Sequence, residues 1–299
     1  MEKELLAIVE IGSNNTKTHI YDNNEVVYDH TATIEFKKNY KLEGKVSDDD
    51  LGKLYKEIDT ALTYTDNINI YGCSIFRNIT DEELESINNE LKEKYNLKIN
   101  VVSQEEEAEY TALGVYGNID YNGNMCIFIG GGGSTELIIV NNKEIIERKY
   151  LNFGVVDITN KYPDLKDDIA TTPFDEIHSY IDSLIGDFNP KCDILILAGG
   201  DHPYWYNNAE FALDKNTLYE SYNQPYMIPI DVSNKYDHDT LTISLDKVRN
   251  NSDNPLLFDG SRAMKMITYV IAERINAKYI VPTRINMEDG IKNKLINKD

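Results

Sequence analysis

Residues 125–150 read MCIFIGGGGSTELIIVNNKEIIERKY, and residues 5–30 read LLAIVEIGSNNTKTHIYDNNEVVYDH. Each stretch contains an apolar run, a glycine-containing turn, a second β-rich run, a polar turn and a third run. The runs are rich in Val, Ile, Thr and Tyr, which is typical of strands joined by hairpins. A shift of 119 residues pairs Gly12 with Gly131. The sequence therefore predicts two copies of one three-stranded meander.

Helices and strands alternate after each meander, which is the pattern of an α/β layer architecture. After the first meander we expect helices near 48–63, 81–95 and 105–116, and strands at 67–74 and 98–103. After the second we expect helices near 155–162, 172–187, 256–276 and 287–298, strands at 193–198 and 278–282, and an irregular segment over 201–238. The expected domains are residues 1–119 and 120–285, with the C-terminal helix 286–299 as a candidate to pack on the first.

The two glycine-containing turns are candidate phosphate-binding loops. Two copies of one module predict an interdomain cleft lined by both turns, with a hinge motion between the copies. Backbone N–H groups in such turns form anion-binding sites. The alternative is that each turn is only a hairpin that needs positive φ. The candidate phosphate-binding residues in the turns are Gly12, Ser13, Asn14, Gly131, Gly132, Gly133, Ser134 and Thr135.

Five segments carry a resemblance to a known family. They are AIVEIGSNNTK (7–17), YGCSIFRN (71–78), VVSQEEEAEYTALGV (101–115), CIFIGGGGSTELII (126–139) and LNFGVVDIT (151–159). In that order they resemble the first phosphate loop, the segment with a phosphate-binding Arg, the catalytic-Glu helix, the second phosphate loop and the following strand of the exopolyphosphatase/guanosine pentaphosphate phosphatase (Ppx/GppA) family. The resemblance covers nearly the whole chain.

The resemblance implies an α/β protein of two duplicated RNase H-like, actin-like domains. It also implies a phosphoanhydride hydrolase that uses Mg²⁺, or Mn²⁺ in its place. The implied substrate is inorganic polyphosphate or a guanosine pentaphosphate-like nucleotide, cleaved at a terminal phosphoanhydride bond.

Glu107 matches the catalytic Glu of the family, and its chemistry fits that role. Adjacent acids raise each other's pKa, which suits a general base for water. For its neighbours Glu105 and Glu106 we favour another explanation, because acids gather at helix N-termini. Arg77 matches the phosphate-binding Arg and follows the strand at 67–74, where α/β ligand sites gather. A guanidinium can bind phosphate with two hydrogen bonds, although a surface ion pair is the alternative.

Three further residues are candidates on the strength of the resemblance. Lys17 stands where the family commonly has Arg and is expected to bind phosphate, although an exposed strand Lys fits equally well. Glu136 matches the acid after the second loop and is expected to act in catalysis and in metal binding. The alternative for Glu136 is an outward-facing strand side chain. Glu10 is expected to hold Mg²⁺.

The sequence departs from the family at one central position. Both family loops usually carry an Asp two residues before the first matched Gly, and here these positions are Glu10 and Ile129. Ile129 cannot ligate Mg²⁺. Either Asp201, after the third glycine-rich element, supplies a replacement carboxylate, or the chain is a catalytically impaired nucleotide- or polyphosphate-binding protein. The Arg usual before the long helix is also not evident in SDNPLLFDG (252–260).

Composition narrows the partners. The formal net charge is −21, which disfavours nucleic-acid binding. No apolar stretch approaches the ~18 residues of a membrane span, and the N-terminus does not resemble a signal peptide. The three cysteines are far apart and predict free thiols in the cytoplasm. The Tyr-rich part of 201–238 offers rings on which a nucleotide base could stack. We favour the alternative that it covers the core of the second domain or forms a homodimer interface.

Overall fold

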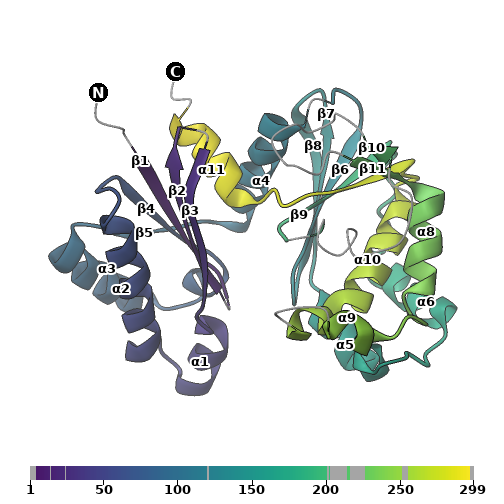
Figure 1. Ribbon diagram of the computed structural model, residues 1–299, viewed down its shortest axis with the longest axis horizontal. Coiled ribbons are helices and arrows are strands. Elements are labelled where there is room, and N and C mark those ends of the chain that lie inside the picture. The colour runs from purple at the N-terminus through teal and green to yellow at the C-terminus, as the bar shows by residue number, and fades with distance from the viewer. Residues whose placement is uncertain are drawn as a thin grey trace. The chain divides into compact units, whose positions relative to one another are not determined.

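The computed structural model describes residues 5–13, 15–23, 25–119, 121–200, 202, 214–215, 226–250 and 255–296. The chain divides into an N-terminal unit, Met1–Tyr110 with Ile291–Asp299, and a C-terminal unit, Thr111–Gly290. Each unit has its own sheet and its own core (Figure 1). Within the described part of the chain, no helix is both long and apolar enough to cross a bilayer.

The N-terminal unit contains a five-stranded sheet in the order β3-β2-β1-β4-β5. β1, β2 and β3 form an antiparallel meander, and β4 and β5 add to β1 in parallel. The strands are β1 (Leu5–Ile11), β2 (Asn15–Asp22), β3 (Glu25–Thr33), β4 (Ile68–Gly72) and β5 (Ile99–Val101). The helices are α1 (Phe36–Glu43), α2 (Asp48–Leu62), the 3₁₀ turn η1 (Ser74–Arg77), α3 (Asp81–Tyr95) and the start of α4 (Gln104–Asn118).

The C-terminal unit contains a seven-stranded sheet in the order β10-β11-β12-β9-β6-β7-β8. Its strands are β6 (Met125–Gly130), β7 (Thr135–Asn141), β8 (Glu144–Leu151), β9 (Ile194–Ala198), β10 (Asp214–Lys215), β11 (Tyr226–Pro229) and β12 (Tyr279–Pro282). Its helices are α5 (Val155–Lys161), η2 (Pro163–Lys166), α6 (Phe174–Ile185), α8 (Ile230–Asp239), α9 (Leu245–Arg249), η3 (Pro255–Gly260), α10 (Ser261–Arg274) and the start of α11 (Met287–Ile296).

Both sheets are built on one topology. In the second sheet, β6, β7 and β8 form the antiparallel meander, and β9 and β12 follow β6 in parallel, as β4 and β5 follow β1. The prediction of an α/β fold with two duplicated domains of the actin-like type is therefore confirmed. The expected cleft between the domains stays a prediction.

The duplication extends to irregular details of the backbone. A register shift follows Ile20 in the first meander and Ile139 in the second, which are 119 residues apart. The turns that join the second and third strands place Asn23 at φ 54° and Asn142 at φ 49°. Asn tolerates this left-handed region better than most residues because its short side chain can bond locally. The two hairpins therefore share a backbone as well as a strand order.

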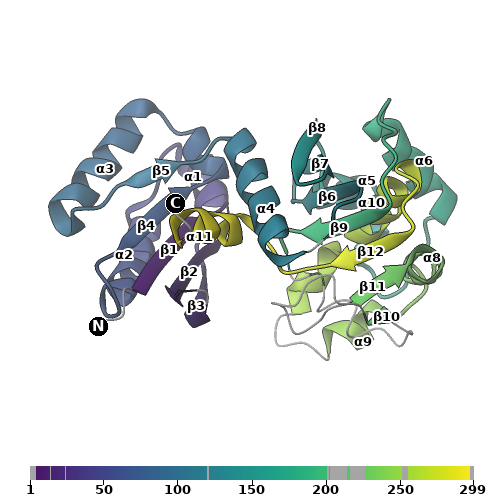
Figure 2. The ribbon, with the colours of Figure 1, turned by 90° about the horizontal axis from the view of Figure 1, so that it is seen from above.

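Each sheet has an apolar face covered by helices. In the N-terminal unit, Leu54 and Ile58 of α2 are fully buried in one core with Val9 of β1. In the C-terminal unit, residues of α6 and α10 share a core with the central strands, and Figure 2 shows α10 beside that sheet. The apolar face of an amphipathic helix is what such a sheet needs to exclude water.

Two predictions about secondary structure in the C-terminal unit were wrong in detail. The segment 201–238 is not irregular throughout, because Tyr226–Pro229 forms β11 and Ile230–Asp239 forms α8. β11 pairs antiparallel with β12, which lies about 50 residues further along the chain. The strand therefore depends on a distant partner, and the local sequence pattern does not predict it. The long helix begins at Ser261 rather than near 256, after a 3₁₀ turn that ends at Gly260. The aromatic residues at 204–206, 219 and 222 lie outside the described residues.

Candidate active site

The first phosphate-loop candidate closes the hairpin between β1 and β2. The N–H of Gly12 donates to the carbonyl of Asn15 at 2.9 Å. The carbonyl of Ser13 accepts from the N–H of Lys37, in the first turn of α1, also at 2.9 Å. The loop is thereby fixed both to its own hairpin and to the following helix. Asn14, the remaining candidate in this loop, lies outside the described residues.

Glu10 and Lys17 lie opposite each other on β1 and β2, next to the turn, at a place that we call the hairpin mouth. The strand register pairs the two residues, and Lys17 Nζ lies 3.1 Å from Glu10 Oε2. The side chain of Glu10 is 15% exposed and that of Lys17 is 29% exposed. The expected metal ligand and the expected phosphate-binding base are thus brought together as one ion pair.

Arg77 and Glu107 form a second ion pair beside the carboxyl end of β4. Arg77 ends η1, and its Nη1 donates to Glu107 Oε2 at 2.8 Å and to the carbonyl of Val102 at 3.0 Å. Glu107 lies in the first turn of α4, and its side chain is 33% exposed. The proposed base and the proposed phosphate-binding Arg are therefore in direct contact.

The start of α4 explains why Glu107 is available for such a contact. Ser103 Oγ accepts from the N–H of Glu106, and the Ser103 N–H donates to Glu106 Oε2 at 2.9 Å. This reciprocal pair is a capping box. The hydrogen bonds from the Ser103 backbone and hydroxyl lower the pKa of Glu106. Glu106 thus caps the helix, and Glu107 projects from the next position toward Arg77.

The buried thiol of Cys73 lies near both ion pairs. Burial raises the pKa of Cys73 far above its ordinary value, and the negative charges of Glu10 and Glu107 raise it further. The positive charges of Arg77 and Lys17 act in the opposite direction. The strand register pairs Glu10 with Tyr71 of β4, and the Cys73 N–H donates to the carbonyl of Ile11 at 2.9 Å. The four charged side chains thus form one charged cluster where β1 and β4 end.

The second phosphate-loop candidate repeats the first in the C-terminal unit. The Gly131 N–H donates to the carbonyl of Ser134 at 2.9 Å, and the carbonyl of Gly132 accepts from the N–H of Val156 in α5 at 2.7 Å. Both bonds correspond to those of the first loop after a shift of 119 residues. Gly132 and Gly133 are exposed, so their backbone is accessible.

Gly154 lets the chain pass unusually close to this second loop. A Cβ at Gly154 would lie 2.4 Å from the carbonyl oxygen of Gly131 and 2.8 Å from that of Gly132. The adjacent Phe153 carbonyl accepts from the buried hydroxyl of Thr135 at 3.0 Å. Gly154 and Thr135 therefore hold the second loop in place. The LNFG segment (151–154) thus needs a glycine at its last position so that its backbone can pack against this loop.

The mouth of the second hairpin carries different chemistry from the first. Ile129 lies opposite Glu136, at the positions that Glu10 and Lys17 occupy in the N-terminal unit. Ile129 also contacts the third glycine-rich loop: Gly199 has φ +81°, and a Cβ there would lie 2.9 Å from Ile129 Cγ2. An apolar contact thus stands where the family usually has an Asp. Asp201 lies outside the described residues.

A divalent metal fits these residues only in a limited way. Among the described residues, no three His, Cys, Asp or Glu side chains gather as a metal site. Glu10 is paired with Lys17, and Glu136 faces Ile129. Mg²⁺ commonly takes one or two protein carboxylates and completes its shell with water and substrate phosphates. Glu10 and Glu136 could each supply one such carboxylate to a Mg²⁺ that arrives with a phosphate substrate.

Arg262 is the charged residue that sequence reasoning missed. It lies at the second position of α10, is 1% exposed, and its pKa is lowered by burial. Its guanidinium donates to five backbone carbonyls, of Leu165, Asp167, Asp168, Thr240 and Ile243. It therefore ties two loops to the start of the helix. No sequence pattern marks this role, because all five acceptors are backbone carbonyls.

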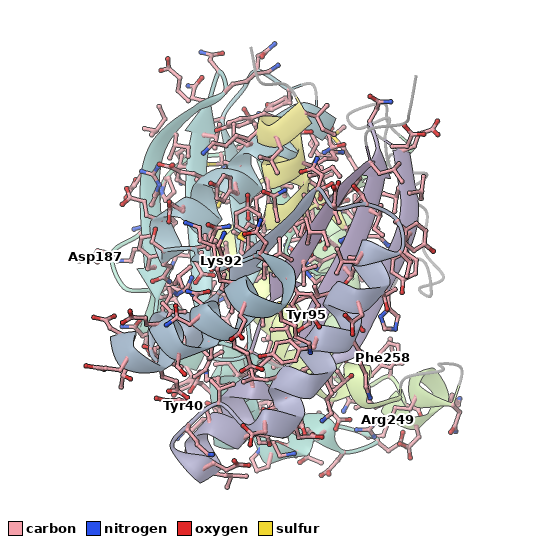
Figure 3. All side chains as sticks on the ribbon, turned by 90° about the vertical axis from the view of Figure 1, so that its left-hand side faces the viewer. Tyr40, Lys92, Tyr95, Asp187, Arg249 and Phe258 are labelled. Atoms are coloured by element: carbon pink, nitrogen blue, oxygen red, sulfur yellow. The ribbon has the colours of Figure 1, made fainter. Side chains whose placement is uncertain are left out.

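Arg249 is a second base in the same region. It pairs with Asp259 at 2.7 Å and with Asp246 at 2.9 Å, and it donates to the carbonyl of Lys166. Figure 3 shows its side chain near the labelled Phe258 of η3. Arg249 and Arg262 thus act within the C-terminal unit as structural bases.

Comparison with known proteins defines first the fold and then the family. The structure is similar to an Aquifex aeolicus Ppx/GppA family member (TM-score 0.77, 16% identity, covering 99% of both chains). It is also similar to an exopolyphosphatase from Cytophaga hutchinsonii (TM-score 0.74, 15% identity, covering 98% of both chains). These likenesses show that the chain has the two-sheet fold of these two proteins. The model of the Ppx/GppA phosphatase family matches residues 25–196, and the chain belongs to that family.

A further relative is similar over a shorter stretch. A bifunctional 3-dehydroquinate synthase/phosphatase of Fusobacterium nucleatum is 33% identical over 116 residues. The matched segment covers 38% of this chain and 17% of that protein. The likeness thus concerns one part of a much longer protein.

Proposed function

We propose that this chain hydrolyses the terminal phosphoanhydride bond of inorganic polyphosphate or of a guanosine pentaphosphate-like nucleotide. Membership of a phosphatase family supports the reaction class. The observation that carries the proposal is the contact of 2.8 Å between Arg77 and Glu107. The contact supports the proposal because a guanidinium is a group that binds phosphate well and a carboxylate is a group that can take the proton of an attacking water.

The proposed step uses Glu107 as the general base. A water oxygen attacks the terminal phosphorus, its proton passes to Glu107, and the bond to the bridging oxygen breaks. The products are phosphate and a chain or nucleotide shortened by one phosphate. Arg77, Lys17 and the backbone of the two loops would bind the phosphates, with Ser13 and Ser134 among the loop residues. The side chain of Thr135, which the sequence also suggested, is fully buried and donates to the Phe153 carbonyl, so it supports the loop instead.

Glu10 and Glu136 are the described residues that would hold Mg²⁺ or Mn²⁺, and Asp201 is a further candidate. When bound, such an ion neutralises charge on phosphate oxygens. We infer that turnover is limited by the missing carboxylate at Ile129, because among the described residues Ile129 packs against Gly199 and Glu136 is the acid opposite it.

A second function is favoured by the same observation at Ile129. The chain could bind a nucleotide or polyphosphate without appreciable turnover, since the family Asp is replaced by a residue that cannot hold a metal. We also infer a reducing compartment, the cytoplasm, because the side chains of Cys73, Cys126 and Cys192 are buried thiols far apart in the sequence.

The test is phosphate release from polyphosphate and from guanosine pentaphosphate, with Mg²⁺, with Mn²⁺ and with EDTA. Metal-dependent release from either substrate supports hydrolysis. Tight binding of the same substrates with no release above the EDTA control would favour the binding function instead.

A further inference from the structure

Both bases that are expected to bind phosphate in the N-terminal unit already have carboxylate partners. Lys17 lies 3.1 Å from Glu10, and Arg77 lies 2.8 Å from Glu107. A phosphate that binds either base must therefore compete with a carboxylate of this chain.

We propose that Glu10 and Glu107 are internal counter-ions, which an incoming phosphate displaces from Lys17 and Arg77. The proposal rests on the proposed function in assigning phosphate binding to these two bases. Because Glu10 Oε2 lies 3.1 Å from the ammonium group of Lys17, Glu10 serves as a counter-ion to Lys17, and this role is separate from holding a metal. Displacement also releases Glu107 from Arg77 at the moment when a substrate is present.

The geometry of Arg77 allows its partner to be exchanged without loss of position. Among the described residues, its hydrogen bonds involve Nη1 alone, to Glu107 and to the carbonyl of Val102. If Glu107 is displaced, the Val102 carbonyl still holds the guanidinium beside the end of β4. A guanidinium presents two nitrogens to one phosphate group, which a single carboxylate oxygen on Nη1 does not match.

The exposure of the two pairs also favours exchange. The side chains are between 15% and 33% exposed, so water reaches both pairs. Ion pairs that remain in contact with water are weak and are easily replaced by a partner of higher charge. A terminal phosphate carries up to two negative charges, against one on a carboxylate.

Repulsion sets the sign of the expected effect. A carboxylate that stays within a few ångströms of a bound phosphate repels it, and the water that weakens the ion pairs also keeps this repulsion modest. Removing the carboxylate charge should therefore tighten metal-free phosphate binding. A carboxylate that acted as a metal ligand would show the opposite pattern, with weaker binding of the phosphate in Mg²⁺.

The experiment is calorimetric titration of the full-length chain with pyrophosphate in EDTA. Glu10→Gln and Glu107→Gln should each bind pyrophosphate about three- to tenfold more tightly than the wild type. Lys17→Met and Arg77→Met should bind it more weakly. The matched control is Glu25→Gln, which removes one charge at the opposite end of the same sheet, opposite Asp22. At roughly 17 Å along the strand from Glu10 it lies beyond the screening length, and we expect less than a twofold change.

Three results would overturn the proposal: unchanged binding in both Gln variants, weaker binding in both, or no detectable pyrophosphate binding by any of the chains. The two variants test the idea independently, so a folding defect in one leaves the other to decide it. Phosphate release is measured in parallel. A wild type that binds pyrophosphate but releases no phosphate from the substrates contradicts the proposed hydrolysis alone, whereas the Gln variants contradict the counter-ion proposal alone.

Discussion

The β1–β2 hairpin of the N-terminal unit and the β6–β7 hairpin of the C-terminal unit share the same backbone hydrogen bonds. They differ in the charges of the side chains next to the turn. Gly12 and Gly131 make the same turn hydrogen bond, and Ser13 and Gly132 accept from the helix that follows. At the hairpin mouth the first copy has Glu10 opposite Lys17, whereas the second has Ile129 opposite Glu136.

This difference shows which property of the hairpin is constrained and which is free. The backbone is fixed by the glycine turn and by the strand register. The mouth residues stand at the ends of interior strands, next to the turn, and differ in charge between the two copies although the fold is the same. In each copy the pair avoids two opposed carboxylates, which would be destabilising directly across a sheet. Neither hairpin therefore needs a resident cation to remain folded.

The largest expected effect concerns the charged cluster of the N-terminal unit, which the C-terminal hairpin does not reproduce. Glu107→Gln should lower phosphate release by about 10²–10⁴-fold, because it removes the positioned general base. Glu105→Gln, two positions earlier on the same helix, is the matched control and should leave release nearly unchanged. Release that is equal in both variants would remove Glu107 from the mechanism.

The next effect separates the two loops by their supporting residues. Gly154→Ala should destabilise the protein by about 1–3 kcal/mol, because its Cβ would overlap backbone atoms of Gly131 and Gly132. The equivalent position in the first copy is Glu35, an exposed residue paired with Lys38. Glu35→Ala should change stability by less than about 1 kcal/mol. Thermal unfolding measures both variants, and equal shifts would mean that the two loops are supported in the same way.

A smaller effect tests the shared turn between the second and third strands. Asn23→Ala and Asn142→Ala should each cost about 1 kcal/mol, because Ala is less tolerant of the left-handed backbone that both turns adopt. Gly at the same positions should be tolerated. Chemical denaturation of the four variants gives the comparison. A marked difference between the two Ala variants would argue against equivalent turns.

The smallest effect is the pH dependence of the α4 cap. The folded-state pKa of Glu106 is lowered, so its contribution to stability is complete above the ordinary Glu pKa of about 4.3 and is lost as pH falls through the lower folded value. Glu106→Gln should therefore be less stable than the wild type at pH 7, by under about 1 kcal/mol, and the difference should shrink toward pH 3. A difference that does not change with pH would separate Glu106 from the charge effect.

Much of the fold could be predicted because short stretches of sequence indicate its strands, turns and helices. The apolar runs of Val and Ile and the glycine turns mark both meanders, and the 119-residue shift marks the duplication. Helix α1 was missed because its sequence FKKNYKLE is short and polar, and Phe36 is its one buried residue. The same shift aligns it with α5, so the repeat itself held the missing signal. β11 was missed because it depends on pairing with β12, far along the chain.

The candidate site was predictable as a set of residues and less so as a set of contacts. The sequence singled out Glu10, Lys17, Arg77 and Glu107 separately. That they form two ion pairs depends on strand register and on where η1 and α4 begin, which motif spacing does not specify. Arg262 was missed because its five acceptors are backbone carbonyls, and backbone carbonyls have no sequence signature.

The most direct test of the account is metal-dependent phosphate release by Ile129→Asp. This substitution restores the carboxylate that the family has and places it opposite Glu136. Position 129 is half-buried, and an unpaired carboxylate opposite Glu136 is costly, so folding must first be confirmed by thermal unfolding with and without Mn²⁺. The account predicts higher Mg²⁺-dependent release than in the wild type. A folded Ile129→Asp protein with unchanged or lower release would contradict the claim that position 129 limits turnover.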